Sequence, residues 1–145
     1  MAGSIVAGEN TICVSTGSRR NESGHVVSYT NIGRKRWQIE FERSIAGDPA
    51  LADGSLCIAD YNGRLYAIDA ETGAQLWVSA EGEIEPSRGL DDDSRPSVIG
   101  ETVIYPDHRE RLSAFDVTGE VLWRASEIRG EWAIAVEDAV LYGNY

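Results

Sequence analysis

The sequence has 145 residues, enough for a single domain that buries a sizeable hydrophobic core without metals or disulfides. Its 13 basic and 24 acidic residues give a formal net charge of -11, which argues against a nucleic-acid-binding or anionic-lipid-binding surface. With 42% hydrophobic residues, 26% charged residues and 15 glycines, the composition excludes a disordered acidic chain and a coiled coil, and it indicates a turn-rich folded domain.

Four segments share a hairpin pattern in which two short apolar runs flank a polar turn. The turns are, in chain order, Glu9-Asn10, Asp53-Gly54, Gly100-Glu101 and Glu137-Asp138. Apolar and β-branched residues around two turn formers predict a pair of antiparallel strands at each place. Cys13 and Cys57 occupy equivalent positions in the second run, where later copies have isoleucine and leucine. We therefore interpret both thiols as small buried hydrophobes.

A second pattern follows each of the first three hairpins, with a glycine four residues before a tryptophan. The pairs are Gly33 and Trp37, Gly73 and Trp77, and Gly119 and Trp123. The spacing of about 40 to 46 residues indicates a repeating unit of four strands.

In the second unit we expect strands at about residues 48–52, 55–60, 64–69 and 74–79. Asn62-Gly63 predicts a two-residue hairpin turn, and Gly73 would supply a positive φ in the next turn. No segment predicts a helix. The third strand of this unit has apolar residues on both faces, which predicts a sheet covered on both sides.

A four-stranded sheet with two apolar faces must stack on copies of itself, and radial stacking gives an all-β propeller. A linear solenoid is the less favoured alternative. The expected blades cover about residues 2–43, 46–80 and 94–126, and strands A and B of a fourth blade cover about 130–145. A propeller needs about four to eight blades to close. We therefore expect a segment of a larger ring, or copies that associate to complete one.

The second unit resembles the Ala-x-Asp-x-x-Thr-Gly-x-x-x-Trp repeat of the PQQ-like, or quinoprotein dehydrogenase-like, propeller family. Its matching residues are Ala67, Asp69, Thr72, Gly73 and Trp77. The third unit keeps the alanine, aspartate, glycine and tryptophan, but its turn is one residue shorter. The first unit keeps only the glycine and the tryptophan. The third unit's matches are Ala114, Asp116, Gly119 and Trp123, and in the first unit Ser28 and Thr30 replace the alanine and aspartate.

These repeated residues are expected to build the blade rather than to catalyse a reaction. The aspartate would accept backbone N–H groups in the turn, the glycine would take the left-handed conformation, and the tryptophan would fill the space between blades. Residues that recur in every blade cannot all lie in one active site.

Sites in propellers usually lie at the mouth of the channel, where three longer segments are expected: 16–24, 80–94 and 107–110. The acidic run Asp91, Asp92 and Asp93 is a weak candidate cation loop because it lacks the spacing of known calcium loops. His25 and His108 have no Cys or Ser partner in a catalytic arrangement, and we interpret both as surface residues.

The resemblance implies three alternatives. The favoured one is a non-catalytic propeller, or part of one, that acts as a protein-binding scaffold without a cofactor. The second is part of a quinone-dependent dehydrogenase with PQQ and calcium, although the chain has no Cys-Cys pair. The third is a short chain that completes a propeller by self-association.

Partners and location are predicted only coarsely. We expect other propeller blades and protein partners, no nucleic acid and no membrane insertion. No signal or transmembrane segment is predicted in these residues, and the resemblance favours an extracytoplasmic location. Lys35 is the only lysine, and an acidic excess with little lysine is typical of proteins adapted to high salt. GC-rich coding with an ordinary acidic surface is the alternative.

Overall fold

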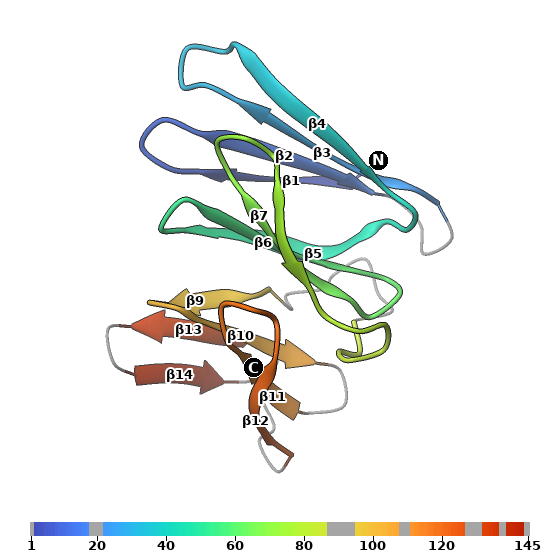
Figure 1. Ribbon diagram of the computed structural model, residues 1–145, viewed down its shortest axis with the longest axis vertical. Coiled ribbons are helices and arrows are strands. Elements are labelled where there is room, and N and C mark those ends of the chain that lie inside the picture. Colours follow the sequence, from blue (N-terminus) through green and yellow to red (C-terminus); the bar gives the residue numbers. More distant parts are fainter. Residues whose placement is uncertain are drawn as a thin grey trace.

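The chain folds into stacked four-stranded antiparallel sheets, as a computed structural model shows (Figure 1). The structure describes residues 2–17, 22–86, 95–107, 111–126, 132–136 and 139–143. Fourteen strands make up this part of the chain, which contains no helix. Among the described residues, therefore, no helix has the length and apolar character needed to cross a bilayer.

Strands in each sheet follow one another in sequence order, and every neighbouring pair is antiparallel. The first sheet consists of β1 (Ala2–Ala7), β2 (Ile12–Gly17), β3 (Gly24–Tyr29) and β4 (Lys35–Phe41). The second consists of β5 (Ile45–Ala52), β6 (Ser55–Asp60), β7 (Leu65–Asp69) and β8 (Gln75–Val78).

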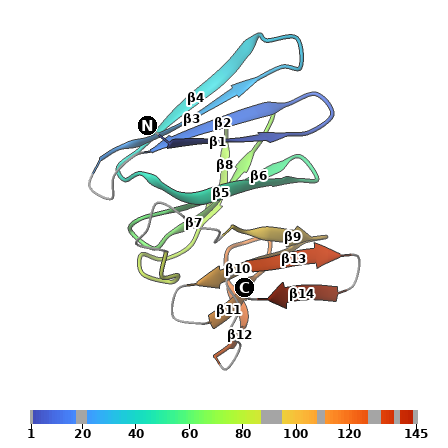
Figure 2. The ribbon, with the colours of Figure 1, turned by 180° about the vertical axis from the view of Figure 1, so that it is seen from behind.

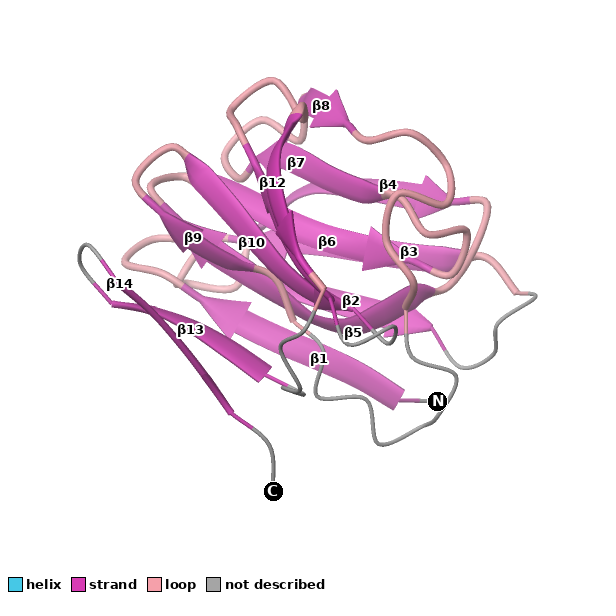
Figure 3. Cartoon of the chain, turned by 90° about the horizontal axis from the view of Figure 1, so that it is seen from below, coloured by secondary structure: helices cyan, strands magenta, loops and turns pink. Residues whose placement is uncertain are grey.

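The third sheet and a strand pair complete the described chain. The third sheet consists of β9 (Ser97–Ile99), β10 (Thr102–Asp107), β11 (Arg111–Phe115) and β12 (Val121–Ala125). The pair consists of β13 (Trp132–Val136) and β14 (Ala139–Gly143). Figure 2 shows the sheets following one another along the long axis of the molecule, with the strand pair beside the third sheet. The view along that axis shows strands of successive sheets crossing at an angle (Figure 3).

Two turns of the second sheet show how local chemistry sets the register. Asp53 and Gly54 both have positive φ, 49° and 76°, as a two-residue type I′ hairpin requires. The turn between β6 and β7 differs from the predicted two-residue Asn62-Gly63 turn, because only Gly63 has a positive φ and the connection spans residues 61–64. The Asp60 carboxylate accepts the N–H groups of Asn62 and Arg64, at 2.8 and 3.1 Å, and this stabilises the longer turn.

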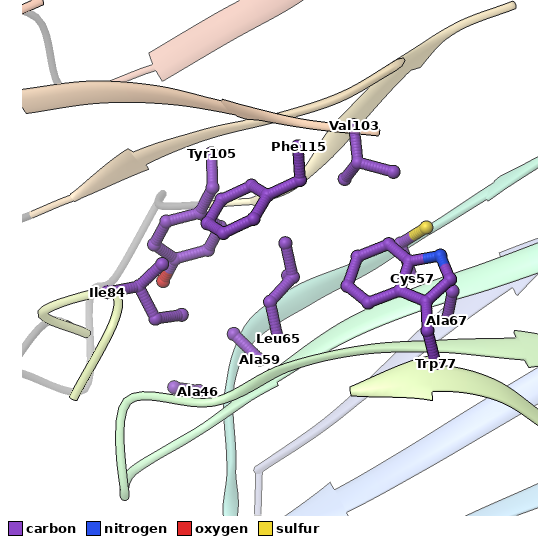
Figure 4. Close-up of a cluster of buried hydrophobic side chains, with 10 residues drawn as sticks. All are labelled: Ala46, Cys57, Ala59, Leu65, Ala67, Trp77, Ile84, Val103, Tyr105 and Phe115. Carbon is purple, nitrogen blue, oxygen red and sulfur yellow. The ribbon is translucent and has the colours of Figure 1, made fainter. Parts of the chain in front are cut away.

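Two of the buried clusters among the described residues lie between sheets, and a smaller one lies on a single face of the third sheet. One cluster joins the first and second sheets, and a second joins the second and third sheets (Figure 4). Alternation along β7 directs Tyr66 and Ile68 toward the first sheet, and Leu65 and Ala67 toward the third. A sheet with both faces buried is what the sequence predicts for this unit. These stacked antiparallel sheets confirm the predicted all-β, propeller-type fold class.

Candidate functional site

Strand β4 of the first sheet is held against the turn of the second sheet by a tryptophan. The Trp37 ring lies so close to Gly73 that a Cβ added there would be 2.8 Å from Trp37 Cγ. The indole Nε1 donates a hydrogen bond of 3.1 Å to the Ala70 carbonyl, to which Ser28 Oγ also donates, at 3.4 Å. Glycine at position 73 therefore permits the close approach that brings ring and turn together.

The same arrangement joins the second and third sheets. A Cβ added at Gly119 would be 2.7 Å from Trp77 Cε3. The Trp77 ring also stacks on Phe115, with ring centroids 6.4 Å apart and an interplanar angle of 20°. Only 8% of Trp77 is exposed. We call this contact, between a tryptophan of one sheet and the turn glycine of the next, the tryptophan seat.

The backbone register around each tryptophan is the same in all three complete sheets. The Cα partners of Trp37, Trp77 and Trp123 on the neighbouring strand are Ser28, Ala67 and Ala114, and a register shift follows each of these three residues. The alignment of Ser28 with the two alanines is therefore also a structural equivalence.

Two residues of the pattern have no seat in the part of the chain that the structure describes. Gly33 has φ of +82°, yet a Cβ added there would meet nothing within 4 Å. At the other end, 43% of Trp123 is exposed, compared with 8% of Trp77. In the described residues, the glycine turn of the first sheet is therefore not in contact with a tryptophan. The tryptophan of the third sheet is likewise not covered by a glycine turn.

The aspartates of the repeat organise their own turns. Asp69 Oδ1 accepts hydrogen bonds from the backbone N–H groups of Glu71 and Thr72 and from Thr72 Oγ1, at 2.8 to 3.0 Å. The hydrogen bonds that Thr72 donates therefore lower the pKa of Asp69. In the third sheet, Thr118 lowers the pKa of Asp116 in the same way.

Thr30 takes the place of the aspartate in the first sheet, and its Oγ1 accepts the Arg34 N–H at 3.0 Å. The hydroxyl supplies the acceptor contact that the Asp116 carboxylate makes with the Glu120 N–H in the third sheet.

A polar cluster that the sequence did not single out lies at the turn between β6 and β7. Asp60 is 1% exposed, and its Oδ2 accepts a hydrogen bond of 2.9 Å from the Tyr66 hydroxyl. Burial raises the pKa of Asp60, although hydrogen bonds from Arg64 and Tyr66 oppose that effect. The Arg64 guanidinium in turn pairs with Glu81 at 2.7 Å.

The segment after β8 folds back over this turn. Gly82 N–H and Ile84 N–H donate to the carbonyls of Asn62 and Gly63, at 3.1 and 3.2 Å. A Cβ at Gly63 would be 2.4 Å from the Ile84 carbonyl oxygen, so this position has room only for glycine. Glu83 pairs with Arg124 of β12, which connects the segment to the third sheet.

An open groove of about 530 Å³ lies beside this cluster, between β4 of the first sheet and β8 of the second. Its lining combines apolar side chains with one cation and several carboxylates. Among the lining residues are Phe41, Glu42, Arg64, Tyr66, Val78 and Glu81. The Phe41 and Tyr66 rings meet edge to face, 5.1 Å apart. A mixed apolar and charged groove suits a peptide or protein segment better than a small polar substrate.

The other residues considered from the sequence do not converge with this groove on a catalytic centre. Cys13 and Cys57 are free and buried, and burial raises the pKa of Cys57 to about 12. His25 Nε2 lies 3.7 Å from Glu40 Oε1 on the first sheet. Asp91, Asp92, Asp93 and His108 lie outside the described residues.

A calcium centre needs several carboxylate or amide oxygens close together. The described side chains include no group of three or more His, Cys, Asp or Glu that would hold a metal ion. Described residues therefore do not fit the calcium centre that the dehydrogenase resemblance implies.

Comparisons with known proteins identify the family. The family described as outer membrane protein assembly factor BamB matches residues 1–139. BamB of Nitrosomonas eutropha is 29% identical over 97 residues, which are 66% of this chain and 22% of that protein. The chain thus spans about a fifth of the length of this relative.

Solved structures show the same fold. The structure of BamB from Moraxella catarrhalis superposes with a TM-score of 0.69 at 24% identity, over 95% of this chain and 40% of that chain. A europium-containing methanol dehydrogenase superposes with a TM-score of 0.61 at 18% identity, over 84% of this chain and 24% of that one. Together with the repeated tryptophan seats, the match over residues 1–139 shows that this chain belongs to the BamB family of PQQ-like repeat proteins.

Proposed function

We propose that the chain is part of a non-catalytic propeller that binds a protein partner. The observation that carries this proposal is the open groove between β4 and β8, whose lining combines apolar and charged side chains. Membership of the BamB family supports it, because that family is described as an assembly factor for outer membrane proteins.

The groove has the composition of a protein-binding surface. Tyr66 and Arg64 are residue types that contribute strongly to protein interfaces, and they lie on its lining beside Phe41. The Tyr66 and Phe41 rings are mostly buried between the first and second sheets, so a partner would meet only their edges. Glu40, Glu42 and Glu81 outnumber the single arginine on the lining. A partner segment with an apolar residue flanked by lysine or arginine would match both features.

Photo-crosslinking in the source cell, with the full-length protein that contains this chain, tests the proposal. A photoreactive amino acid would replace Glu42 or Glu81 at the groove, and Glu9, an exposed turn residue of the first sheet, would serve as the control position. We expect one and the same protein adduct from both groove positions, and none from position 9. In an Arg64→Glu background, which removes the single cation of the lining, the attraction for a basic partner is stronger and the yield of the adduct should rise.

The proposal would be wrong if positions 42 and 81 gave no adduct, or gave the same adducts as position 9. The second candidate function, a quinone-dependent dehydrogenase, is supported by the fold shared with methanol dehydrogenase. Direct titration of the full-length protein with the cofactor separates the two.

A further inference from the structure

A small pocket lies between the second and third sheets, on the face of the second sheet that is turned away from the first. Its volume is about 120 Å³, and both sheets contribute to its lining. The buried part of the lining consists of Cys57, Ala67, Trp77 and Val103. An apolar cavity of about 150 Å³ can hold benzene, so this pocket has room for an organic molecule of about five or six heavy atoms.

Two valines leave this space open. Val98 and Val103 are cross-strand partners in the third sheet, at the positions that Leu51 and Leu56 occupy in the second. Between the first and second sheets those leucines pack into the core, and a Cβ added at Gly8 would be 3.0 Å from Leu51 Cδ2. Each valine is one methylene group shorter than its counterpart, so the equivalent space between the second and third sheets is not filled.

The indole N–H of Trp77 lacks the acceptor that its counterpart in the first sheet has. Trp37 Nε1 donates to the Ala70 carbonyl at 3.1 Å, whereas Trp77 Nε1 donates no hydrogen bond to any of the described residues. Trp77 is nevertheless more than nine-tenths buried, with 8% of its surface exposed. A buried donor of this kind is stabilised by any molecule that brings an acceptor to it.

The way in which the glycine turn of the third sheet covers Trp77 explains why the N–H is left free. A Cβ added at Gly119 would meet Trp77 Cε3 and Cζ3, at 2.7 and 3.4 Å, on the side of the indole remote from Nε1. Figure 4 shows the Trp77 nitrogen on the side of the ring where Cys57 lies, and Cys57 lines the pocket. The N–H is therefore directed into the pocket and not toward the turn.

Water is a poor occupant of the buried part of this pocket. A buried water molecule usually makes about three hydrogen bonds. Besides the indole N–H, the buried lining presents only Cys57, Ala67 and Val103, which are apolar or weakly polar. A carbonyl oxygen is satisfied by a single N–H donor, and an apolar group attached to it would replace the water with contacts to these side chains.

The exposed part of the lining restricts the charge of a ligand. Asp53 and Glu101 lie there, together with the exposed side chains of Leu76 and Val117. Two carboxylates at the opening repel an anion, and the apolar interior penalises the burial of any charged group. A ligand that supplies an acceptor to Trp77 must therefore be uncharged.

We propose that the pocket between the second and third sheets binds a small uncharged carbonyl compound, a ketone, ester or amide of about five or six heavy atoms. Its carbonyl oxygen accepts the Trp77 N–H, and its apolar part contacts Ala67 and Val103. This site is separate from the groove between β4 and β8, and its occupation does not depend on a protein partner in that groove.

Titration of the full-length protein that contains this chain with cyclopentanone tests the proposal. The tryptophan indoles would be labelled with nitrogen-15, and the Trp77 signal would be assigned through nuclear Overhauser contacts with Phe115, whose ring stacks on it. We expect a saturable downfield shift of the Trp77 indole proton as the new hydrogen bond forms. The Trp37 indole signal should stay in place, because its N–H already donates to Ala70.

Two analogues separate the contributions of the acceptor and of the charge. Methylenecyclopentane has nearly the same shape as cyclopentanone but no carbonyl oxygen, and it should bind about fivefold more weakly. Cyclobutanecarboxylate is an anion of similar size, and it should show no saturable binding because the apolar lining cannot solvate its charge.

Filling the pocket supplies the matched test on the protein. Val98→Leu introduces the side chain that the second sheet has at the equivalent position, Leu51, and Val103→Leu does the same for Leu56. Each variant should weaken cyclopentanone binding at least about tenfold, because the added carbon atom occupies the space of the ligand. Val121→Leu is the control, since Val121 lies on β12 with 37% of its surface exposed, and its affinity should match the wild type.

Three outcomes would each overturn the proposal. The first is a Trp77 indole signal that cyclopentanone does not shift. The second is binding of methylenecyclopentane or cyclobutanecarboxylate as tight as that of cyclopentanone. The third is wild-type affinity in both Val98→Leu and Val103→Leu while the unchanged Trp37 signal shows that the sheets remain folded.

Discussion

Gly73 and Gly33 have nearly the same φ angle in different surroundings. Comparing substitutions at the two positions therefore measures how much the tryptophan seat contributes to the free energy of unfolding. Their φ angles are +77° and +82°, but only Gly73 contacts a tryptophan ring. We expect Gly33→Ala to cost about 1 kcal/mol, for the left-handed backbone alone. Gly73→Ala should cost about 2–4 kcal/mol, because the methyl group also collides with Trp37.

Urea denaturation of the two variants measures the difference directly. Equal losses of stability would mean that the contact between Trp37 and Gly73 contributes nothing beyond the shape of the turn.

The Asp69 turn makes a prediction about pH. Because the folded pKa is lowered, the stabilising effect of the carboxylate is fully present above the unfolded pKa and is lost as the pH falls through the lower folded pKa. We expect Asp69→Asn to be less stable than the wild type at pH 7, with a difference that shrinks below about pH 4. Melting temperatures between pH 2.5 and pH 7 test this, and a difference independent of pH would contradict it.

At the scale of single residues, the sequence predicts a role best where a side chain forms hydrogen bonds within its own turn. The aspartate, threonine and glycine of the repeat carry their chemistry in a few consecutive residues. Asp60 was missed because its burial depends on Tyr66 and on the segment around Glu81, which are distant from the local pattern. The same contacts explain why Asn62-Gly63 forms a longer turn than the dipeptide alone predicts.

At the level of elements, the segment after β8 acts as a wedge between the second and third sheets. Ile84 is 1% exposed and lies beside Tyr105 in the cluster between them (Figure 4). Its backbone N–H also donates to Gly63. A segment without regular secondary structure therefore helps to fix how two sheets are placed relative to each other.

Shortening the isoleucine tests this role. We expect Ile84→Ala to cost about 2–4 kcal/mol, as for other large buried aliphatic side chains. Ile5→Ala is the matched control and should cost no more than about 0.5 kcal/mol, because Ile5 is 71% exposed. Chemical denaturation of both variants gives the comparison, and a small effect at Ile84 would show that the sheets do not depend on the wedge.

The strands themselves were largely predictable, because alternating apolar residues, turn formers and the spacing of the tryptophans all recur. In the second sheet the expected strand at 55–60 matches β6, and β7 and β8 lie within one residue of the expected bounds. The wedge was not predictable, because nothing periodic in residues 79–86 indicates which surface Ile84 would meet.

At the scale of the whole molecule, the net charge of -11 should make the stability of the fold depend on the salt concentration. Repulsion between carboxylates is screened by salt, with a Debye length of about 10 Å at 0.1 M and about 3 Å at 1 M. We therefore expect the melting temperature to rise between low salt and molar sodium chloride. A melting temperature indifferent to salt over this range would remove the inference of salt adaptation.

We propose that the stacked sheets form a binding scaffold and not part of a quinone enzyme. The most direct measurement is a titration of the full-length protein that contains this chain with PQQ in the presence of calcium, followed by the absorbance of the quinone and by calorimetry. We expect no saturable binding and no dependence on calcium. Stoichiometric, calcium-dependent binding of the quinone would contradict it and would assign the protein to the dehydrogenases.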